Sequence, residues 1–289
     1  MWDPTTYLRY GDERGRPFGE LLGRIGAVTP APGPGSAAGS DGAAAGSGSD
    51  SAAAGSGSAG GPAVEVVDLG CGPGTLTVGL ADRFPGARIR GFDSSAEMIA
   101  AARTLGSTVD FEVLDVRDWQ PGPAVRVVLA NAVLQWVPGH TDLLRRWAGA
   151  LAPGAYLAFQ VPGNFDAPSH RAIRAVAAGP RWARSVAAGL RDPASVLDPV
   201  GYAELLTAAG CTVDAWETTY VHLLPVRGAD HPVLGWLEGT ALRPVRAVLD
   251  DEGWADFRTE LSTVLAAEYP IRDGLVYFPF RRIFVVARI

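Results

Sequence analysis

The run Val66-Val67-Asp68-Leu69-Gly70-Cys71-Gly72-Pro73-Gly74 carries the strongest structural signal in this chain. Two β-branched residues lead into an aspartate, three glycines then alternate with other residues, and apolar residues recur at helical spacing over 76–84. This order predicts a strand, a glycine-rich turn and a helix. Glycine lets the backbone pass close beneath a ligand, and a helix N-terminus presents free N–H donors. The stretch therefore predicts a binding site for a nucleotide-containing cofactor.

The spacing of the glycines separates two classes of cofactor. A dinucleotide-binding turn follows the pattern G-x-G-x-x-G/A, and here Thr75 stands where the third small residue is needed. The alternation of Gly70, Gly72 and Gly74 after Asp68 instead resembles motif I of the S-adenosylmethionine (SAM) methyltransferases. In that family the loop holds the amino-acid end of SAM. The resemblance implies a Rossmann-like α/β fold and SAM as the cofactor.

Polar residues also follow the next three predicted strands, at 87–92, 109–114 and 125–130. The ends of these strands carry, in order, Asp93-Ser94, Asp115-Val116 and Asn131-Ala132. Parallel strands bring their carboxyl ends to one edge of a sheet, so we expect a single crevice there. Asp93 stands where a ribose presents its hydroxyls, although Asp93 or Ser94 is equally placed to cap a helix over 96–104.

The methyltransferase resemblance assigns Asp115 to the adenine amino group, whereas a surface loop acid is the alternative. Together, the strand ends and the resemblance give one set of residues expected to bind SAM: Asp68, Gly70, Cys71, Gly72, Asp93, Ser94, Met98, Asp115, Val116, Asn131, Ala132 and Trp136.

Composition divides the 289-residue chain into four parts. Residues 29–63 contain only Thr, Pro, Ala, Gly, Ser and two Asp, so this stretch cannot bury a core and is predicted to be a disordered insertion. We expect residues 1–28 to form an N-terminal lid and helix, residues 64–161 the SAM-binding core, and residues 162–289 a helical cap with the closing strands of the same domain.

The charged residues exclude several function classes. All 25 basic residues are Arg, which removes Schiff-base chemistry and pyridoxal-phosphate attachment, because both need Lys. The formal net charge of −6 argues against binding of nucleic acid or an anionic membrane. Cys71 and Cys211 form no disulfide framework, and they share no zinc spacing with the four histidines, so no metal is expected. We expect a reduced, cytoplasmic protein without a membrane span.

The remainder of the chain continues the α/β pattern. We expect helices at 16–25, 141–151, 169–190, 199–210, 232–242 and 245–267, and strands at 155–161, 211–224 and 283–289. Two strands after the fifth give a seven-stranded sheet with helices on both faces. The methyltransferase fold is such a sheet, with one antiparallel strand. The helices at 169–190 and 232–267 are then expected to form a cap over the site.

Motifs outside the glycine loop give a narrower resemblance, which covers nearly the whole chain. The chain is similar to the trans-aconitate 2-methyltransferases, and its one clear departure is the insertion at 29–63. The similarity rests on Trp2-Asp3-Pro4, Tyr7-Leu8, Arg14-x-Arg16-Pro17, the glycine loop, Asp93-Ser94-Ser95-x-x-Met98, Asp118-Trp119, Asn131-Ala132-x-Leu134-Gln135-Trp136, Gly210-Cys211-x-Val213-Asp214-x-Trp216-x-Thr218-Thr219-Tyr220, Leu242-Arg243-Pro244 and Phe278-Pro279-x-Arg281-Arg282-x-Phe284.

This resemblance implies transfer of a methyl group from SAM to a carboxylate of trans-aconitate, giving the monomethyl ester. A carboxylate is already ionised at pH 7, so we nominate no catalytic base. The carboxylates that do not react need cations, and the planar fork of Arg binds a carboxylate bidentately. The expected substrate-binding residues are Trp2, Tyr7, Arg14, Gln135, Asn164, Tyr220, Trp236, Arg243, Arg281 and Arg282.

The sequence leaves some choices open. On a strand, Arg281 and Arg282 point to opposite faces, so only one of them is expected to reach the ligand. Two alternative functions are a SAM-dependent methyltransferase with a different small acceptor and a SAM-binding protein without turnover. A nicotinamide oxidoreductase is a third, against which the glycine spacing counts. The sequence says nothing about oligomeric state.

Overall fold

Seven strands form a single mixed sheet in this computed structural model, which describes residues 11–28, 64–186, 190 and 196–289. The order across the sheet is β3-β2-β1-β4-β5-β7-β6, and β7 runs antiparallel to both of its neighbours. The strands are β1 (Glu65–Leu69), β2 (Arg88–Asp93), β3 (Asp110–Val113), β4 (Val125–Asn131), β5 (Tyr156–Pro162), β6 (Thr212–Pro225) and β7 (Leu275–Arg288). The predicted seven-stranded α/β sheet is confirmed.

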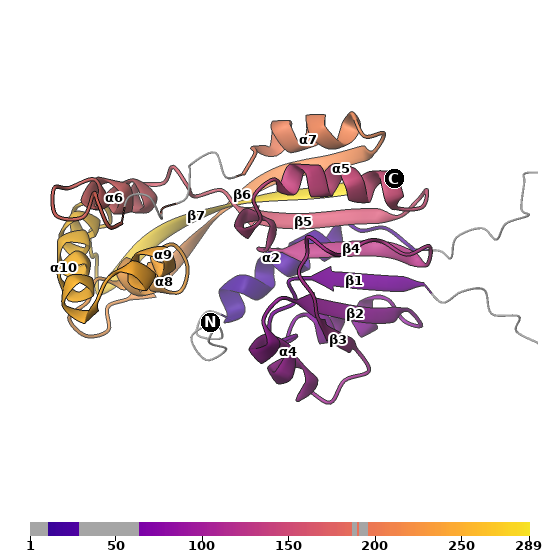
Figure 1. Ribbon diagram of the computed structural model, residues 1–289, viewed down its shortest axis with the longest axis horizontal. Coiled ribbons are helices and arrows are strands. Elements are labelled where there is room, and N and C mark those ends of the chain that lie inside the picture. Colours follow the sequence, from indigo (N-terminus) through magenta and orange to yellow (C-terminus); the bar gives the residue numbers. More distant parts are fainter. Residues whose placement is uncertain (1–10, 29–63, 187–189, 191–195) are drawn as a thin grey trace, which may run out of the picture.

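Helices cover both faces of this sheet (Figure 1). On one face, α5 (His140–Ala150) packs on the central strands, and α7 (Pro199–Thr207) lies beside it on β6 and β7. On the other face lie α2 (Gly11–Gly23), α3 (Leu80–Arg83) and α4 (Ala96–Arg103). Two short 3₁₀ turns, η1 (Thr77–Gly79) and η2 (Leu134–Trp136), follow the ends of β1 and β4. Of the helix expected at 76–84, only α3 is α-helical, after the η1 turn.

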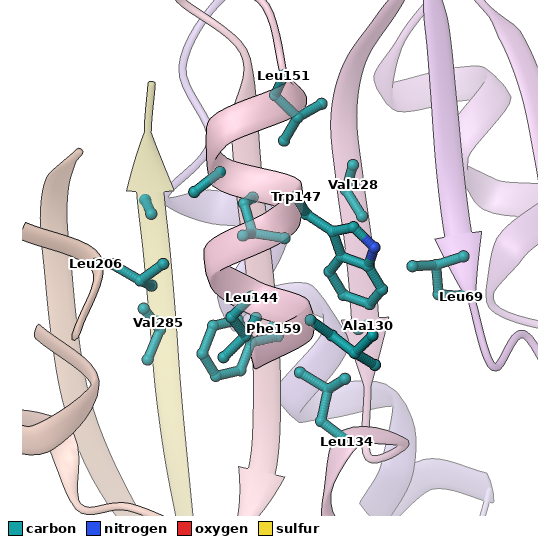
Figure 2. Packing of buried hydrophobic residues seen from close by; sticks show 14 of the residues in the cluster. Leu69, Val128, Ala130, Leu134, Leu144, Trp147, Leu151, Phe159, Leu206 and Val285 are labelled. Atoms are coloured by element: carbon teal, nitrogen blue, oxygen red, sulfur yellow. The ribbon is translucent and has the colours of Figure 1, made fainter. Parts of the chain in front are cut away.

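The core under α5 is built around one tryptophan (Figure 2). Trp147 is fully buried, its ring meets Trp119 edge-on at a centroid distance of 5.6 Å, and its Nε1–H donates to the Trp119 carbonyl at 3.4 Å. Leu69, Val128 and Phe159 from three neighbouring strands close around it. All residues from Val125 to Ala130 are buried, because a central parallel strand is covered on both faces. This packing fixes the strand ends that carry the site.

A second body of packed helices stands on the outer halves of β6 and β7 (Figure 1). These two strands pair over fourteen residues, well beyond the end of β5, where Pro162 lies opposite Arg282. Around this extension gather α6 (Pro168–Ala177), α8 (Pro232–Glu238), α9 (Arg243–Val248) and α10 (Asp251–Glu268), with their own buried core. We call α6, α8, α9, α10 and the strand extension the cap lobe.

Three predicted boundaries in this region are wrong. The helix expected over 169–190 ends at Ala177, shortly before Gly179-Pro180, since proline cannot continue the backbone ladder. The helix expected over 245–267 is two helices, because the Asp250 carboxylate accepts from the Gly253 N–H at 2.8 Å and starts a new one. The last strand begins at Leu275 rather than 283, and its Pro279 is tolerated because β7 pairs on one side only beyond β5.

Several expectations fall on parts of the chain that the structure does not describe. The insertion at 29–63 and the lid residues Trp2 and Tyr7 lie outside the described residues. Arg14 lies on α2, but only its backbone is described. Within the described ranges, no helix combines the length and the apolar character needed to cross a membrane.

Candidate cofactor and acceptor site

The glycine loop after β1 adopts a backbone that other residues resist. Gly70, Gly72 and Gly74 have φ values of +73°, +56° and +75°. A Cβ on Gly70 would lie 2.6 Å from the Val133 Cγ2 atom, and a Cβ on Gly74 would lie 2.6 Å from Phe111. Both the left-handed conformation and the close approach therefore require glycine here. The alternating glycines detected in the sequence follow from this turn.

Asp93, at the end of β2, holds the glycine loop in place. One carboxylate oxygen accepts from the Gly72 N–H at 2.9 Å, and the other accepts from the Ser95 N–H at 2.9 Å. Burial raises the pKa of this carboxyl, while the backbone hydrogen bonds oppose that rise. The cap of α4 is Ser95, whose Oγ accepts from the Met98 N–H, so neither Asp93 nor Ser94 is the cap.

Asp68 lies beneath the loop and is almost fully buried. Its carboxylate accepts from the Thr77 hydroxyl at 2.7 Å, which joins β1 to the η1 turn. Burial raises the pKa of Asp68 to about 7, with the nearby charge of Asp93 adding to the rise. Burial also raises the pKa of the Cys71 thiol, and the charges of the two carboxylates raise it further. Cys71 is thus held as an unreactive thiol.

A cavity of about 220 Å³ opens at the carboxyl ends of β1, β2, β3 and β4. We call it the cofactor cavity, and its walls are Leu69, Gly70, Phe92, Asp93, Ser94, Leu114, Asp115, Val116, Arg117, Val133, Trp136, Val137 and Pro138. Asp115 forms an ion pair with Arg117 at 2.6 Å, and this hydrogen-bonded partner lowers the pKa of the Asp115 carboxyl. The cavity, the glycine turn and Asp93 together fit an adenosine-containing ligand.

The expected cofactor residues separate into two groups. Gly70, Asp93, Ser94, Asp115, Val116 and Trp136 line the cofactor cavity. The others lie outside its lining: Asp68, Cys71, Gly72, Met98, Asn131 and Ala132. Met98 is buried on α4, and Ala132 has a φ of +58° beside the strand end. Other apolar wall residues, such as Leu69, Phe92 and Val133, were not predicted, because the motifs do not show which apolar side chains face the cavity.

A second cavity, of about 80 Å³, lies between the sheet edge and the cap lobe. We call it the acceptor cavity, and its walls are Gln135, Trp136, Pro162, Asn164, Phe165, His170, Ile173, Arg174, Leu190, Thr240, Ala241, Pro244 and Phe280. Trp136 lines both cavities, so they adjoin at this residue. The α6 residues and Phe280 were missed in the sequence, because their places in the cavity depend on how the cap lobe packs.

Asn164, expected to bind substrate, is held by the backbone of β7. Its amide donates to the Arg281 carbonyl at 2.9 Å and accepts from the Arg281 N–H at 2.8 Å. Gln135 also lines the acceptor cavity and donates to the Ala132 carbonyl at 2.6 Å. Asn164 therefore shapes the cavity wall through a structural pairing, in addition to any contact with a ligand.

The two adjacent arginines of β7 point to opposite faces, as predicted. Arg281 is partly exposed and pairs with Glu217 at 2.6 Å. Arg282 is 5% exposed, and its guanidinium carbon lies 4.8 Å from the ring centroid of Phe280, which lines the acceptor cavity. Of the two, only Arg282 lies on the side of the acceptor cavity.

Aromatic residues surround the same face of the β6–β7 extension. His222 stacks on Trp236 at a centroid distance of 4.6 Å, and Tyr220 lies next along the strand face. Burial lowers the pKa of His222 to about 4, and the positive charges of Arg282 and Arg16 contribute. His222 is thus neutral at pH 7. Arg243 begins α9 next to the cavity residue Pro244, and burial lowers the pKa of Arg243 as well.

The fold, the glycine turn and the strand-end carboxylates define a SAM-dependent methyltransferase. The methyltransferase domain family matches residues 66–154, from β1 through α5. Among solved structures, the YcgJ protein of Bacillus subtilis aligns with a TM-score of 0.50 at 12% identity, covering 78% of this chain and 92% of that one. At that identity the likeness concerns the fold alone.

Relatives of known name extend over the whole chain. A protein of Mycolicibacterium gilvum is 51% identical, covering 100% of this chain and 99% of its own. A protein of Rhodococcus jostii is 49% identical with full coverage of both chains. Both are named trans-aconitate 2-methyltransferase. This chain belongs to the trans-aconitate 2-methyltransferase family.

Proposed function

We propose that this protein transfers the methyl group of SAM to a carboxylate oxygen of trans-aconitate. The observation that carries the proposal is the family relationship over the full chain, at 46–51% identity to proteins of that name. Two adjoining cavities support it, since a methyl donor and an acceptor must meet and both cavities share Trp136. The product is a monomethyl ester.

When bound, SAM supplies a sulfonium methyl group that passes to the carboxylate oxygen as the carbon–sulfur bond breaks, leaving its electron pair on sulfur. No proton has to leave the acceptor, because a carboxylate is ionised at pH 7. The residues of the site therefore need to bind, orient and exclude water rather than to act as a base. Orientation of this kind can lower a barrier by roughly 7–11 kcal/mol in favourable cases.

On the cofactor side, we assign Asp93 to the ribose hydroxyls and the loop from Gly70 to Gly74 to the amino-acid end. Asp93 suits this role because it lines the cofactor cavity and already anchors the loop through the Gly72 N–H. Asp115 is assigned to the adenine end, and Arg117 must then share or release its carboxylate. Asn131, Ala132 and Trp136 are assigned to the side that faces the acceptor, because Trp136 lines both cavities and closely follows the other two in the chain.

On the acceptor side, we assign Arg282 and Arg243 to the carboxylates that do not react, with Tyr220 and Trp236 shaping the wall. Both arginines are buried or half-buried next to residues of the acceptor cavity, where a charged hydrogen bond is stronger than at the surface. The cap lobe, within residues 162–289, closes this side.

We also assign a lid over the site to the N-terminal part of the chain, within residues 1–28. The guanidinium carbon of Arg16 lies 4.7 Å from the Tyr220 ring centroid, so α2 passes beside the acceptor side of the site. Trp2, Tyr7 and Arg14 are assigned to this lid over the bound ligands.

The test is methyl transfer from radiolabelled SAM to a panel that contains trans-aconitate, cis-aconitate, isocitrate, citrate, amines and phenols. We expect selective labelling of trans-aconitate, with the label lost on mild base hydrolysis, as an ester requires. Labelling that survives base, or labelling of amines or phenols alone, contradicts carboxylate methylation. Binding of SAM without labelling of any acid contradicts the assigned acceptor.

A further inference from the structure

A row of three hydrogen-bonded side chains, all buried or half-buried, runs from β7 on the acceptor side to the end of β4. Gln160 on β5 is fully buried, and its amide lies between Arg282 of β7 and Asn131 of β4. The Arg282 Nη1 donates to the Gln160 Oε1 at 2.8 Å. The Gln160 Nε2 donates to the Asn131 Oδ1 at 3.2 Å. Strand register brings them together, because Gln160 lies directly opposite Asn131.

Arg282 determines which group donates and which accepts in each of these two side-chain hydrogen bonds. A guanidinium can only donate, so the Gln160 oxygen must face it. The Gln160 NH₂ group must then face Asn131, and the Asn131 oxygen must accept from it. The Asn131 NH₂ group is left pointing away from Gln160, and among the described residues no protein group accepts from it.

The backbone of Gln160 fixes the same strand end. Its carbonyl accepts from the Ala132 N–H at 2.8 Å, and Ala132 holds the left-handed φ of +58° that turns the chain after β4. The Ala132 carbonyl in turn accepts from Gln135, which lines the acceptor cavity. One residue thus orients both the side chain of Asn131 and the turn that follows it.

We propose that Gln160 is a positioning residue that makes Asn131 present an N–H donor, and so selects an anionic acceptor. The proposal rests on the function proposed above. Asn131 ends β4 just before Val133 of the cofactor cavity and Gln135 of the acceptor cavity, so we place its NH₂ group near the junction of the two cavities. A donor there suits a carboxylate, whose second oxygen accepts a hydrogen bond, whereas an oxygen there would suit an amine. Arg282 fixes the orientation of the Gln160 amide, and the Gln160 amide fixes the orientation of the Asn131 amide. The Asn131 NH₂ group then donates to the acceptor.

Two single variants test the direction of the amides. Gln160→Glu still accepts from Arg282 but cannot donate, so Asn131 must turn its NH₂ toward Glu and its oxygen toward the acceptor. Asn131→Asp still accepts from Gln160 but presents an oxygen to the acceptor. For each we expect the Kd of trans-aconitate on the complex with S-adenosylhomocysteine, and its KM, to rise roughly 10- to 100-fold. The Kd of SAM is expected to change by less than about threefold, because the variants leave the cofactor cavity's lining intact.

A double variant then tests whether Gln160 acts through Asn131. Gln160→Glu also places a carboxylate beside Arg282, so it weakens acid binding to some extent in any background. In an Asn131→Ala background, its effect on acid binding is therefore expected to be at least about threefold smaller than in the wild-type background, since the group that Gln160 orients is gone. An equal effect in the two backgrounds would mean that Gln160 acts by another route, and would overturn the proposal. So would an unchanged acid Kd for Asn131→Asp, a variant that keeps the link to Gln160 even where Gln160→Glu fails to fold.

Calorimetric binding of the acid, which needs no turnover, separates the two proposals. If the wild-type complex does not bind trans-aconitate, the proposed function fails, and this inference fails with it. If the wild-type binds the acid and the variants bind it equally well, only the role of Gln160 is overturned.

Discussion

Among single residues, Asp93 has the most sharply defined role on the cofactor side. Its two carboxylate oxygens already hold the Gly72 and Ser95 N–H groups. We expect Asp93→Ala to raise the Kd of SAM roughly 10- to 100-fold, because a charged hydrogen-bond partner and the loop anchor are both lost. The KM of the acid at saturating SAM should change little. Isothermal titration calorimetry with SAM measures the first quantity.

The matched control for Asp93 is Asp142→Ala. The Asp142 side chain is 81% exposed and, among the described residues, its ion pair is with Arg145 one turn away, so its loss should leave the Kd of SAM unchanged. If Asp93→Ala raises the acid KM while the Kd of SAM stays at the wild-type value, Asp93 belongs to the acceptor side instead.

Arg243 is the residue that we assign to the acid on the acceptor side. It starts α9 beside Pro244 in the cavity wall, and its side chain is half-buried. We expect Arg243→Ala to raise the KM of trans-aconitate roughly tenfold or more, with the Kd of SAM unchanged, because the variant removes a cation assigned to the acid and not to SAM. Steady-state kinetics at saturating SAM measure the effect.

A second arginine of the same helix provides the comparison for Arg243. Arg246 is exposed and forms an ion pair with Asp251, so Arg246→Ala should leave both constants near their wild-type values. Equal effects of the two variants would show that loss of any α9 cation disturbs the lobe, and would remove Arg243 from the site.

At the scale of the element, the glycine loop depends on packing against the turn after β4. Gly70→Ala combines a left-handed φ with a Cβ 2.6 Å from Val133, whereas Gly86→Ala has a φ of +80° with no atom within 4 Å. We expect Gly86→Ala to lower the free energy of unfolding by about 1–2 kcal/mol from backbone strain alone. Gly70→Ala should cost about 1–3 kcal/mol more, because the new Cβ overlaps Val133. Urea unfolding measures both losses.

Truncation of the neighbour identifies the cause of the Gly70 effect. In the Gly70→Ala protein, Val133→Ala should recover part of the lost free energy of unfolding, because it removes the atoms that the new Cβ meets. Equal losses for Gly70→Ala and Gly86→Ala, with no recovery, would mean that the turn relaxes and that close packing against Val133 is unimportant.

The cap lobe depends on a different element, the long β6–β7 pair. These strands pair from the sheet, at Thr212 and Arg288, out to Pro225 and Leu275 in the lobe. The side chains of Phe278 and Phe280 are buried in the core of the lobe, whereas that of Phe284 is buried in the core beneath α2. One antiparallel strand pair thus contributes both to the core of the lobe and to the cores of the sheet, and this continuity fixes the acceptor cavity between them.

For the whole molecule, buried Asp68 links stability to pH. The pKa of Asp68 is about 7 when folded and 3.8 when unfolded, so the folded protein holds a proton that the unfolded chain has released between these pH values. The stability contributed by the protonated group is therefore fully present below pH 4 and is lost as pH rises through about 7. The cost of ionising Asp68 amounts to as much as ~4 kcal/mol well above pH 7.

The variant Asp68→Asn isolates this cost, because its amide oxygen can still accept from Thr77 without carrying charge. We expect its free energy of unfolding, relative to wild type, to increase from pH 4 to pH 8. Urea unfolding at a series of pH values measures the difference. Parallel curves for the two proteins across this range would show that Asp68 has the same pKa in the folded and unfolded states.

Local sequence patterns determined the half of the protein that binds the cofactor. The alternating glycines after Asp68 indicated left-handed turns, and runs of buried β-branched residues indicated central parallel strands. Because parallel strands end at a common edge, the order of elements alone brought Asp93 and Asp115 to one cavity. Residues such as Met98 and Asn131 were expected at that cavity but lie outside its lining, since periodicity does not give the depth of a side chain.

Tertiary structure decided the acceptor side. The extension of β7 beyond β5 carries the cap lobe away from the sheet, and the register that sets Arg282 opposite Pro162 turns Arg282 inward and leaves Arg281 with Glu217. The same register places Gln160 between Arg282 and Asn131. These partners lie 29 to 122 residues apart in the sequence, so their pairing depends on strand register and lobe packing. A local sequence pattern can show on which side of a strand a residue points, but it cannot show which residue of another strand lies opposite it.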